Sequence, residues 1–310
     1  MHRYLFKRLL MMIPVLLGVT FVVFCLMHLT PGDPARIVLG DLASPEDLAR
    51  YRLEHGLNDP FLLQYGRYLY HAVCHGDLGN SLLTDTPVAT EILGAFPTTL
   101  ELSTLSMLIA ILVGIPFGII SAIKQYSLFD NVVMVLAMVG LAMPVFWLGL
   151  LLILVFSVQL HWLPSSGFYG IQYMILPALA LSAQSIAMLT RMTRSCMLEV
   201  IRQDFIRTVR AKGQKERIVF GRHALKNALI PVITTAGTQF GYLMGGAVLT
   251  EVIFSIPGVG RLMISAISNR DYPMVQGGVL FIAVAISIVI LLVDLLYALI
   301  DPRIKAQYRS

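Results

Sequence analysis

Charged residues are scarce in this 310-residue chain. Only 13% of the residues are Asp, Glu, Lys or Arg, whereas 57% are hydrophobic and the mean hydropathy is +0.77. Soluble domains contain about 25% charged and about 45–50% apolar residues. The composition therefore excludes an ordinary soluble enzyme, a disordered chain and a coiled coil. It indicates an all-α membrane protein whose helices lie mostly in lipid, so the position of the charges matters more than the net charge of +5.

Cysteine is also rare, and Cys25, Cys74 and Cys196 are far apart in the sequence. No Cys-x-x-Cys pair and no second ligand at metal spacing accompany them, so a disulfide framework or a zinc site is not supported. His71 and His75 are four residues apart, which suits one face of a helix. The Gly-Asp pair that follows them predicts a helix end at this point, and no metal site is predicted.

Catalytic motifs are absent as well. The sequence lacks GxxxxGK[ST], so we expect no ATP bound through a P-loop, and it lacks HExxH and GxSxG. No catalytic residue is therefore predicted, and an intramembrane protease or hydrolase is poorly supported. His28, Glu251 and Asp294 are the ionisable residues within the apolar stretches, and each is near a stretch end. Ion-coupled pumps place such charges near the membrane midplane, which leaves an ion-coupled secondary transporter as the alternative of another class.

Long uncharged stretches predict six membrane-spanning helices, because one crossing needs about 20 apolar residues. Residues 131–190 hold no charge and are too long for one helix. The turn-rich segment 161–167, with its interfacial Trp162, divides them into two spans. The predicted spans are residues 9–29, 102–123, 132–158, 172–191, 228–250 and 272–293, the last extending to about residue 300.

Prolines lie deep within three of these predicted spans. At Pro116, Pro144 and Pro177 the ring removes a backbone hydrogen bond and crowds the preceding turn, so we expect a loosened helix. Glycines are numerous in the same spans, and small residues let helices approach closely in lipid. Both features suit a bundle that lines a path or changes shape, but they are common in membrane spans generally.

The basic loops orient the predicted spans. The N-terminus, the C-terminus and residues 194–227, which hold nine Lys or Arg, are all basic. The positive-inside rule assigns these three segments to the cytoplasm, and six spans satisfy all three at once. Residues 31–97 hold four basic and nine acidic residues, as expected of an external segment. The predicted organisation is a cytoplasmic N-terminus and first span (1–30), an external segment (31–97) and a helical core (98–310).

The cytoplasmic loop 194–227 contains a predicted amphipathic helix. Leu198, Ile201, Phe205 and Val209 recur at steps of three and four, which places them on one face with basic residues around them. Gly213 follows as a helix stop that can adopt a left-handed backbone. Such a helix can lie on anionic lipid headgroups, pack on its own bundle or dock into a groove of a cytosolic partner. These residues alone leave the three alternatives open.

Two stretches of this loop, Phe205–Gly213 and His223–Ile233, resemble the cytoplasmic loop of ABC-importer permeases of the dipeptide/oligopeptide/nickel family. In those importers the loop contains a coupling helix that sits in a cleft of the ATPase subunit, so the resemblance favours docking to a partner. The general motif begins Glu-Ala-Ala, where this sequence has Arg207-Thr208-Val209, and its later glycine is kept as Gly213. The residues implied in ATPase coupling are Ile201, Asp204, Phe205, Ile206, Arg207, Thr208, Val209, Arg210, Ala211, Lys212 and Gly213.

The resemblance extends over nearly the whole chain. Each short motif alone is weak, but their order and spacing together are specific. The motifs are PGDP at 31–34, LNDP at 57–60, GDLGNS at 76–81, PTTLEL at 97–102, WLP at 162–164, GGAVLTE at 245–251, FSIPGVGR at 254–261, RDYPMVQG at 270–277 and DPRI at 301–304. The large segment between the first two spans resembles the first of the family's two permease subunits, with residues 98–310 as the permease core.

The resemblance implies the membrane subunit of an ATP-driven ABC importer that works by alternating access in the bacterial cytoplasmic (inner) membrane. The implied partners, besides membrane lipid, are a homologous second permease, two ABC ATPases and an extracytoplasmic substrate-binding protein; no nucleic acid is expected. No cofactor is expected in this chain, because ATP and Mg²⁺ would be bound by the ATPases. Peptide is the preferred substrate, since residues 31–97 hold no convincing metal cluster. Nickel or another metal chelate, and glutathione, are the alternatives.

A second candidate site follows the fifth predicted span. Glu251 and Arg261 flank a turn at Pro257-Gly258, at the outer face of the predicted topology. The simpler interpretation is a pair that holds the shape of the loop. The functional hypothesis is an external gate.

Overall fold

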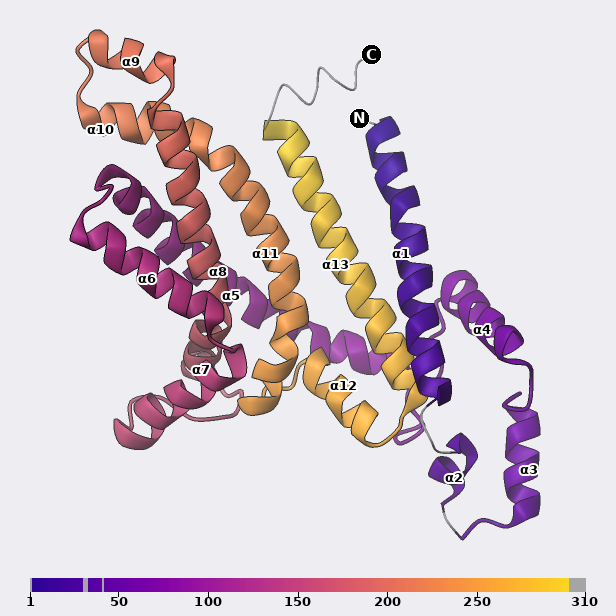
Figure 1. Cartoon of the computed structure of the whole chain (residues 1–310). Coiled ribbons are helices and arrows are strands. Elements are labelled where there is room, and N and C mark those ends of the chain that lie inside the picture. Colours follow the sequence, from indigo (N-terminus) through magenta and orange to yellow (C-terminus); the bar gives the residue numbers. More distant parts are fainter. Residues whose placement is uncertain (1, 30–32, 41, 301–310) are drawn as a thin grey trace. The chain divides into compact units, whose positions relative to one another are not determined.

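The structure is a computed structural model that describes residues 2–29, 33–40 and 42–300. Every named element in these ranges is helical, and the extended pairing consists of an isolated bridge between Asn80 and Pro87. The predicted all-α class is therefore confirmed for the described residues (Figure 1). Pro31 and Gly32 of the first family-like motif and residues 301–304 of the last lie outside the described residues.

The chain forms two compact units. Of the described residues, those within 2–98 and 257–285 form the N-terminal unit, and those within 99–256 and 286–300 form the core unit. Two boundaries between the units fall within long helices, α5 (Val88–Ile123) and α13 (Tyr272–Ile300), and the third follows Ile256, outside any helix.

The N-terminal unit joins one long apolar helix to several short capped ones. Its other elements are α1 (His2–Leu29), α2 (Pro34–Leu39), α3 (Pro45–Glu54), α4 (Phe61–Tyr70), the π-helical turn η1 (His71–His75) and α12 (Val259–Ser268). Asp33 caps α2 by accepting a hydrogen bond from the Ala35 N–H, and Ser44 caps α3 in the same way, with proline at the first helical position of each. Gly76, with a left-handed φ of 64°, ends η1 where the sequence predicts a helix end.

The core unit is built around α8 (Ile171–Ile201), which contacts α6, α7 and α11. Its other elements are α6 (Leu128–Ala142), α7 (Val145–Leu152), the π-helical η2 (Ile153–Gln159), α9 (Asp204–Ala211), α10 (Glu216–Ile218), the π-helical η3 (Val219–Ala224) and α11 (Leu225–Ile253). Helix α5 approaches α8 closely at Gly118, where a Cβ would lie 2.6 Å from the Thr190 carbonyl oxygen. The small residue thus sets the spacing of the two helices.

Four helices in the described residues are long and apolar enough to cross a membrane: Arg8–Leu29, Val88–Ile123, Ile171–Ile201 and Tyr272–Leu295. They coincide with the predicted spans 9–29, 102–123, 172–191 and 272–293. Helix α11 covers the predicted span 228–250 but is not among them, because hydroxyl, amide and glycine residues interrupt its apolar sequence.

The predicted single span 132–158 is wrong as a continuous helix. Helices α6 and α7–η2 meet at a bend of 107°, and counting this pair as one crossing gives up to five spans in the described residues. Pro144 has no N–H to continue the helix, and Met143 before it is extended, with φ −80° and ψ 123°. By contrast, α5 continues through Pro116 and α8 through Pro177. A proline in a predicted span therefore breaks the helix at one of the three positions.

Candidate partner-docking site

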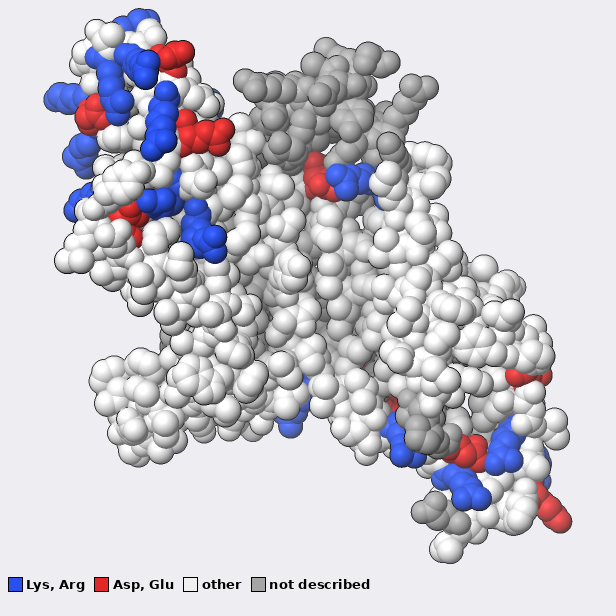
Figure 2. Space-filling view, in the orientation of Figure 1, with Lys and Arg blue, Asp and Glu red and all other residues white. Residues whose placement is uncertain are grey.

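The docking loop, defined here as residues 202–224, connects α8 to α11 at one end of the core unit. After α8 ends at Ile201, α9 runs from Asp204 to Ala211, and α10 and η3 lead without interruption into α11. Lys and Arg side chains gather over α9 and α10, while the visible surface of α6 and α7 carries few charges (Figure 2). The loop therefore presents a strongly basic surface, and both of its ends are attached to long helices, α8 and α11.

The predicted single stripe across residues 198–209 is wrong, because α8 and α9 are separate helices. Gln203 is extended, with φ −74° and ψ 152°, and α9 starts anew at Asp204. The break rotates the face that meets the core: Ile206 is fully buried, whereas Phe205 is 37% exposed. Leu198, Ile201 and Val209 still pack against the core-unit cluster. No glycine or proline directly before α9 marks this break in the sequence. The one local signal is Asp204, an acidic residue of the kind favoured in the first turn of a helix.

The end of α9 is held by backbone and ionic contacts. Gly213 adopts a left-handed φ of 74°, and its N–H donates to the Arg210 carbonyl at 2.9 Å, which confirms the predicted helix stop. The Arg210 Nε and Nη2 atoms donate to the two Glu216 carboxylate oxygens at 2.8 and 3.2 Å. The same guanidinium lies 5.8 Å from the centre of the Phe220 ring. Arg210 thus fastens α9 to α10 and has contacts within the loop.

The outward face of α9 combines one aromatic ring with charged and small polar groups. Phe205, Arg207 and Thr208 are exposed, as are Ala211 and Lys212. Arg207 makes only a long, exposed contact of 3.5 Å with Asp204. An exposed aromatic side chain on a basic helix suits a groove that has an apolar pocket and an acidic rim.

A buried ion pair anchors the base of the docking loop. Arg194, two turns before the end of α8, donates through Nε and Nη2 to the two oxygens of Asp130, both at 2.7 Å. Asp130 also accepts hydrogen bonds from the Ser121 hydroxyl and from the Tyr126 N–H. Its side chain is 2% exposed, and that of Arg194 is 22% exposed. The pair links the end of α5, the start of α6 and the end of α8, so these segments are positioned together.

The four residues of the predicted outer gate are divided between the two units. Glu251 is fully buried in the core unit, where it accepts a hydrogen bond of 2.7 Å from the Thr99 hydroxyl. Its carbonyl accepts from the Ile256 N–H at 2.8 Å. Pro257, Gly258 and Arg261 belong to the N-terminal unit. The structure thus gives Glu251 a partner in its own unit, and its pairing with Arg261 stays a prediction.

Helix α11 carries exposed polar side chains on one side, unlike the exposed side of α6. Thr238 is exposed, Tyr242 is 76% exposed, and Thr235 is half-buried on the same side. The exposed side chains of α6 are apolar, for example Val135 and Leu136. The Thr235 and Thr238 hydroxyls donate to the Pro231 and Thr235 carbonyls of the same helix, at 3.0 and 2.9 Å. The widely exposed Tyr242 side chain, with its polar hydroxyl, suits a helix partner or water better than lipid tails.

No cluster of three or more His, Cys, Asp or Glu that could hold a metal ion occurs in the residues that the structure describes.

Two family models together cover almost the whole sequence. Residues 114–306 match the binding-protein-dependent transport system inner membrane component, and residues 1–103 match the N-terminal part of such components. The chain belongs to this family of importer components. As a member of the family with several apolar helices, it is a multi-pass protein of the bacterial inner membrane.

Curated relatives match this inner membrane component over its full length. A dipeptide transport system permease protein of Alkalihalophilus pseudofirmus is 46% identical, with 98% of this chain and 100% of the relative covered. The dipeptide permease of Escherichia coli K12 is 42% identical, covering 98% and 99%. A di/tripeptide permease of Pseudomonas aeruginosa is 44% identical, covering 99% and 100%.

Solved structures of ABC transporters share the fold. An inward-facing structure of the MetNI methionine ABC transporter aligns with a TM-score of 0.58 and 16% identity, covering 68% of this chain and 96% of the other. An amino acid ABC transporter aligns with a TM-score of 0.53 and 17% identity, covering 69% and 94%. At these identities the likeness establishes the fold of the inner membrane component and nothing about its cargo.

Sequence reasoning about this inner membrane component missed the anchor of the docking loop and the polar face of α11. Asp130 is the one acidic residue between Glu101 and Glu199, which is a signal that it has a specific partner. Its partner Arg194 lies 64 residues further along the chain. The hydroxyl residues of α11 were visible in the sequence, but their common exposure depends on how α11 packs on α8.

Proposed function

We propose that this chain is the first permease subunit of an ATP-driven importer of short peptides. The relatives named as dipeptide and di/tripeptide permeases match it from end to end at 42–46% identity. Both family models fall at the expected places, one on each part of the chain. This full-length match supports the same cargo class for this chain more directly than the fold does, because one fold serves many cargoes.

The proposed topology has six spans with both termini in the cytoplasm. The bent pair α6 and α7–η2 forms the third span, and α11 forms the fifth. A polar face on a spanning helix is costly against lipid. The exposed side of α11 that bears Thr238 and Tyr242 therefore lines an aqueous path, which a homologous second permease encloses from the other side. Residues 31–97, with their acidic excess, lie outside and receive an extracytoplasmic binding protein.

The docking loop transmits the energy of ATP hydrolysis in this proposal. Two ABC ATPase subunits, which bind ATP and Mg²⁺, contact the permeases from the cytoplasmic side, and Phe205 enters a groove of one of them. Ile206 and the Arg210–Glu216 pair keep α9 rigid, so it moves as a unit when the ATPases close. The Asp130–Arg194 pair passes this motion to α5, α6 and α8 together. The bundle then alternates between outward and inward openings.

A co-purification followed by a transport assay tests the proposal. The tagged chain is isolated in mild detergent from native membranes, its partners are identified by mass, and the complex is placed in liposomes with its binding protein. We expect a second permease, P-loop ATPases and ATP-dependent uptake of a radiolabelled dipeptide. A lone oligomer without ATPases after crosslinking would contradict the importer. Uptake of nickel or glutathione without uptake of dipeptides would contradict the cargo.

A further inference from the structure

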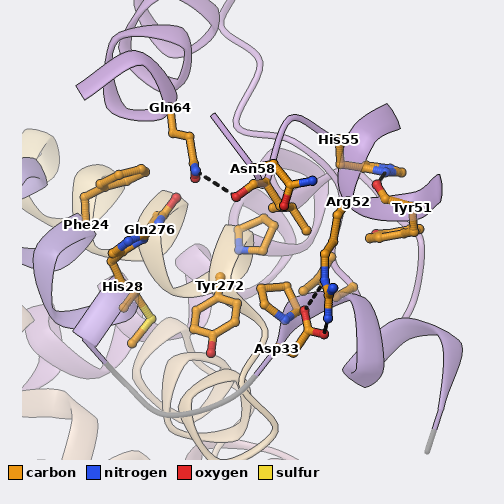
Figure 3. A pocket seen from close by; sticks show the side chains of 15 residues that line it. Phe24, His28, Asp33, Tyr51, Arg52, His55, Asn58, Gln64, Tyr272 and Gln276 are labelled. Atoms are coloured by element: carbon orange, nitrogen blue, oxygen red, sulfur yellow. Dashed lines mark hydrogen bonds and ion pairs between the residues drawn. The ribbon is translucent and has the colours of Figure 1, made fainter. Parts of the chain in front are cut away.

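A cavity of about 540 Å³ lies within the N-terminal unit and is not part of the docking loop. The end of α1, the start of α2, the segment from α3 to α4, and the start of α13 all contribute to its wall. Phe24, His28 and Gln276 lie on one side, and Tyr51, Arg52 and His55 lie on the other (Figure 3). Pockets for small molecules typically measure about 300–1,000 Å³, so the cavity is large enough for a ligand.

The wall of the cavity is fastened by contacts between segments that are distant in sequence. Arg52 donates to both oxygens of Asp33, which ties α3 to the start of α2. The Gln64 amide donates to the carbonyl oxygens of Leu57 and Asp59 at 3.0 and 2.8 Å, which fixes the turn between α3 and α4. These bonds hold the wall open in one shape, as expected of a preorganised site.

Two further contacts fix the wall to the long helices. The Tyr65 hydroxyl donates to the Leu17 carbonyl at 3.0 Å, so α4 is attached to α1. The buried carboxylate of Asp271 accepts hydrogen bonds from the Ser81 hydroxyl and the Leu82 N–H, which attaches the loop before α5 to the start of α13. Leu82 lines the cavity, so its position depends on this attachment.

The lining combines apolar surface with amide groups. Phe24, Met27 and Leu82 provide carbon surface, and Asn58 and Gln276 provide side-chain amides that can donate and accept hydrogen bonds. The one charged pair in the lining, Asp33 with Arg52, is internally neutralised. An amide-rich ligand without net charge and with an apolar side chain matches this lining best.

The two histidines of the lining already have contacts of their own. The ring of His55 stacks on Tyr51 with centroids 3.9 Å apart, and its Nδ1 is 3.0 Å from the Tyr51 carbonyl oxygen. The ring of His28 meets Phe61 edge-on at 5.1 Å. Because both rings pack against other side chains, we expect them to form the wall of the cavity and not to bind a metal ion.

We propose that this cavity is a peptide-binding site within the permease itself, separate from the binding protein. It takes a short peptide, with the amides of Asn58 and Gln276 on the peptide main chain and an apolar side chain against Phe24 and Met27. This inference rests on the proposed function, because the peptide class comes from there. It adds a site at which the permease holds cargo between the binding protein and the membrane path.

Binding of a peptide to the permease–ATPase complex without its binding protein tests the site. The complex is placed in lipid nanodiscs and titrated with tritiated alanyl-leucine. We expect saturable binding, weakened about tenfold in Gln276→Leu and in Asn58→Leu, because each loses hydrogen bonds to the ligand main chain. Gln159→Leu makes the same change at an exposed position of η2 in the other unit and should leave binding unchanged.

A variant that fills the cavity gives a second measurement that does not depend on the amides. Leu57→Trp introduces a bulky ring into the lining and should abolish binding while the complex keeps its unfolding temperature. Equal affinity in wild type and all three cavity variants overturns the site, as does an absence of peptide binding in a complex that imports peptides when its binding protein is added. If the cavity variants bind the binding protein more weakly but keep their affinity for the peptide, the cavity serves to dock the binding protein, and the proposed peptide site is overturned. Failure of the complete system to import any peptide instead overturns the proposed function.

Discussion

Arg194 donates two parallel hydrogen bonds to Asp130, from Nε to Oδ1 and from Nη2 to Oδ2, both 2.7 Å long. The two residues are 64 positions apart, on α8 and α6. A guanidinium and a carboxylate in this geometry resist both sliding and rotation, because two bonds must break together. The contact therefore holds the end of α8 and the start of α6 together at the base of the docking loop, so we expect them to move as a unit.

Asp130→Asn should destabilise the protein and weaken coupling. Removing one partner of a buried pair leaves an uncompensated charge and costs about 3–5 kcal/mol. Because Arg194 is 22% exposed, we expect the lower part of that range. The unfolding temperature in detergent and the peptide-stimulated ATPase activity should both fall. Asp47→Asn breaks an exposed pair with Arg50, whose side chains are 48% and 70% exposed, and should change stability by less than about 1 kcal/mol. Equal effects of the two substitutions would contradict the anchor.

Phe205→Asp should uncouple the ATPases from the permease without unfolding the loop. Phe205 is 37% exposed and faces outward, so the substitution leaves the core of the chain intact but places a charge in the proposed ATPase groove. We expect loss of ATPase stimulation by the loaded binding protein, with normal yield and unfolding temperature. Phe205→Leu keeps an apolar side chain and should retain most of the stimulation. Full stimulation in Phe205→Asp would exclude this residue from the coupling contact.

Local sequence signals predicted a good part of this fold. Four of the six predicted spans coincide with long apolar helices, and Gly213 ends α9 as its position suggested. Such features depend on a few neighbouring residues: a run of apolar side chains, or a glycine that tolerates φ of 74°. The sequence therefore carried them without knowledge of the rest of the chain.

The features that were missed depend on tertiary packing. Pro144 ends α6, whereas α8 continues through Pro177, and the sequence around the two prolines does not distinguish these outcomes. Periodicity placed Phe205 on the apolar stripe, but the break at Gln203 turned Ile206 to the core instead. The cavity of the N-terminal unit joins segments more than 200 residues apart, so no local pattern could reveal it.

Gly118→Val should disrupt the packing of α5 on α8. A Cβ at Gly118 would lie 2.6 Å from the Thr190 carbonyl oxygen and 2.6 Å from the Thr193 Cβ, and the backbone atom cannot move aside easily. Overpacking of this kind costs about 1–3 kcal/mol, which should lower the unfolding temperature. Gly94→Ala on the same helix meets no atom within 4 Å and should be neutral or slightly stabilising, through helix propensity. A neutral Gly118→Val would show that the two helices are farther apart.

The α2–α3 region should loosen at acid pH. Hydrogen bonds from Arg52 lower the pKa of Asp33 below its ordinary 3.8, against the opposing effect of burial. A carboxylate with a lowered pKa stabilises the fold fully above pH 3.8, and this contribution disappears as the pH falls through the lower, folded-state value. Hydrogen exchange of residues 34–54, corrected for intrinsic rates, should therefore quicken below about pH 4. In Asp33→Asn the exchange should be fast already at neutral pH, without an acid step. An identical acid step in wild type and variant would assign it to another group.

The exposed face of α11 should be reached by water-borne reagents, unlike the exposed face of α6. In a variant with its three cysteines replaced by serine, Tyr242→Cys and Thr238→Cys place thiols on the α11 face, and Leu136→Cys places one on α6. Tyr242 and Leu136 are similarly exposed, at 76% and 63%, so exposure alone predicts equal labelling by a membrane-impermeant maleimide. An aqueous path predicts labelling on α11 that changes when the ATPases are trapped closed, and none on α6, because lipid shields its thiol. If none of the three is labelled in any nucleotide state, the α11 face is covered by the second permease, and the path runs along another helix.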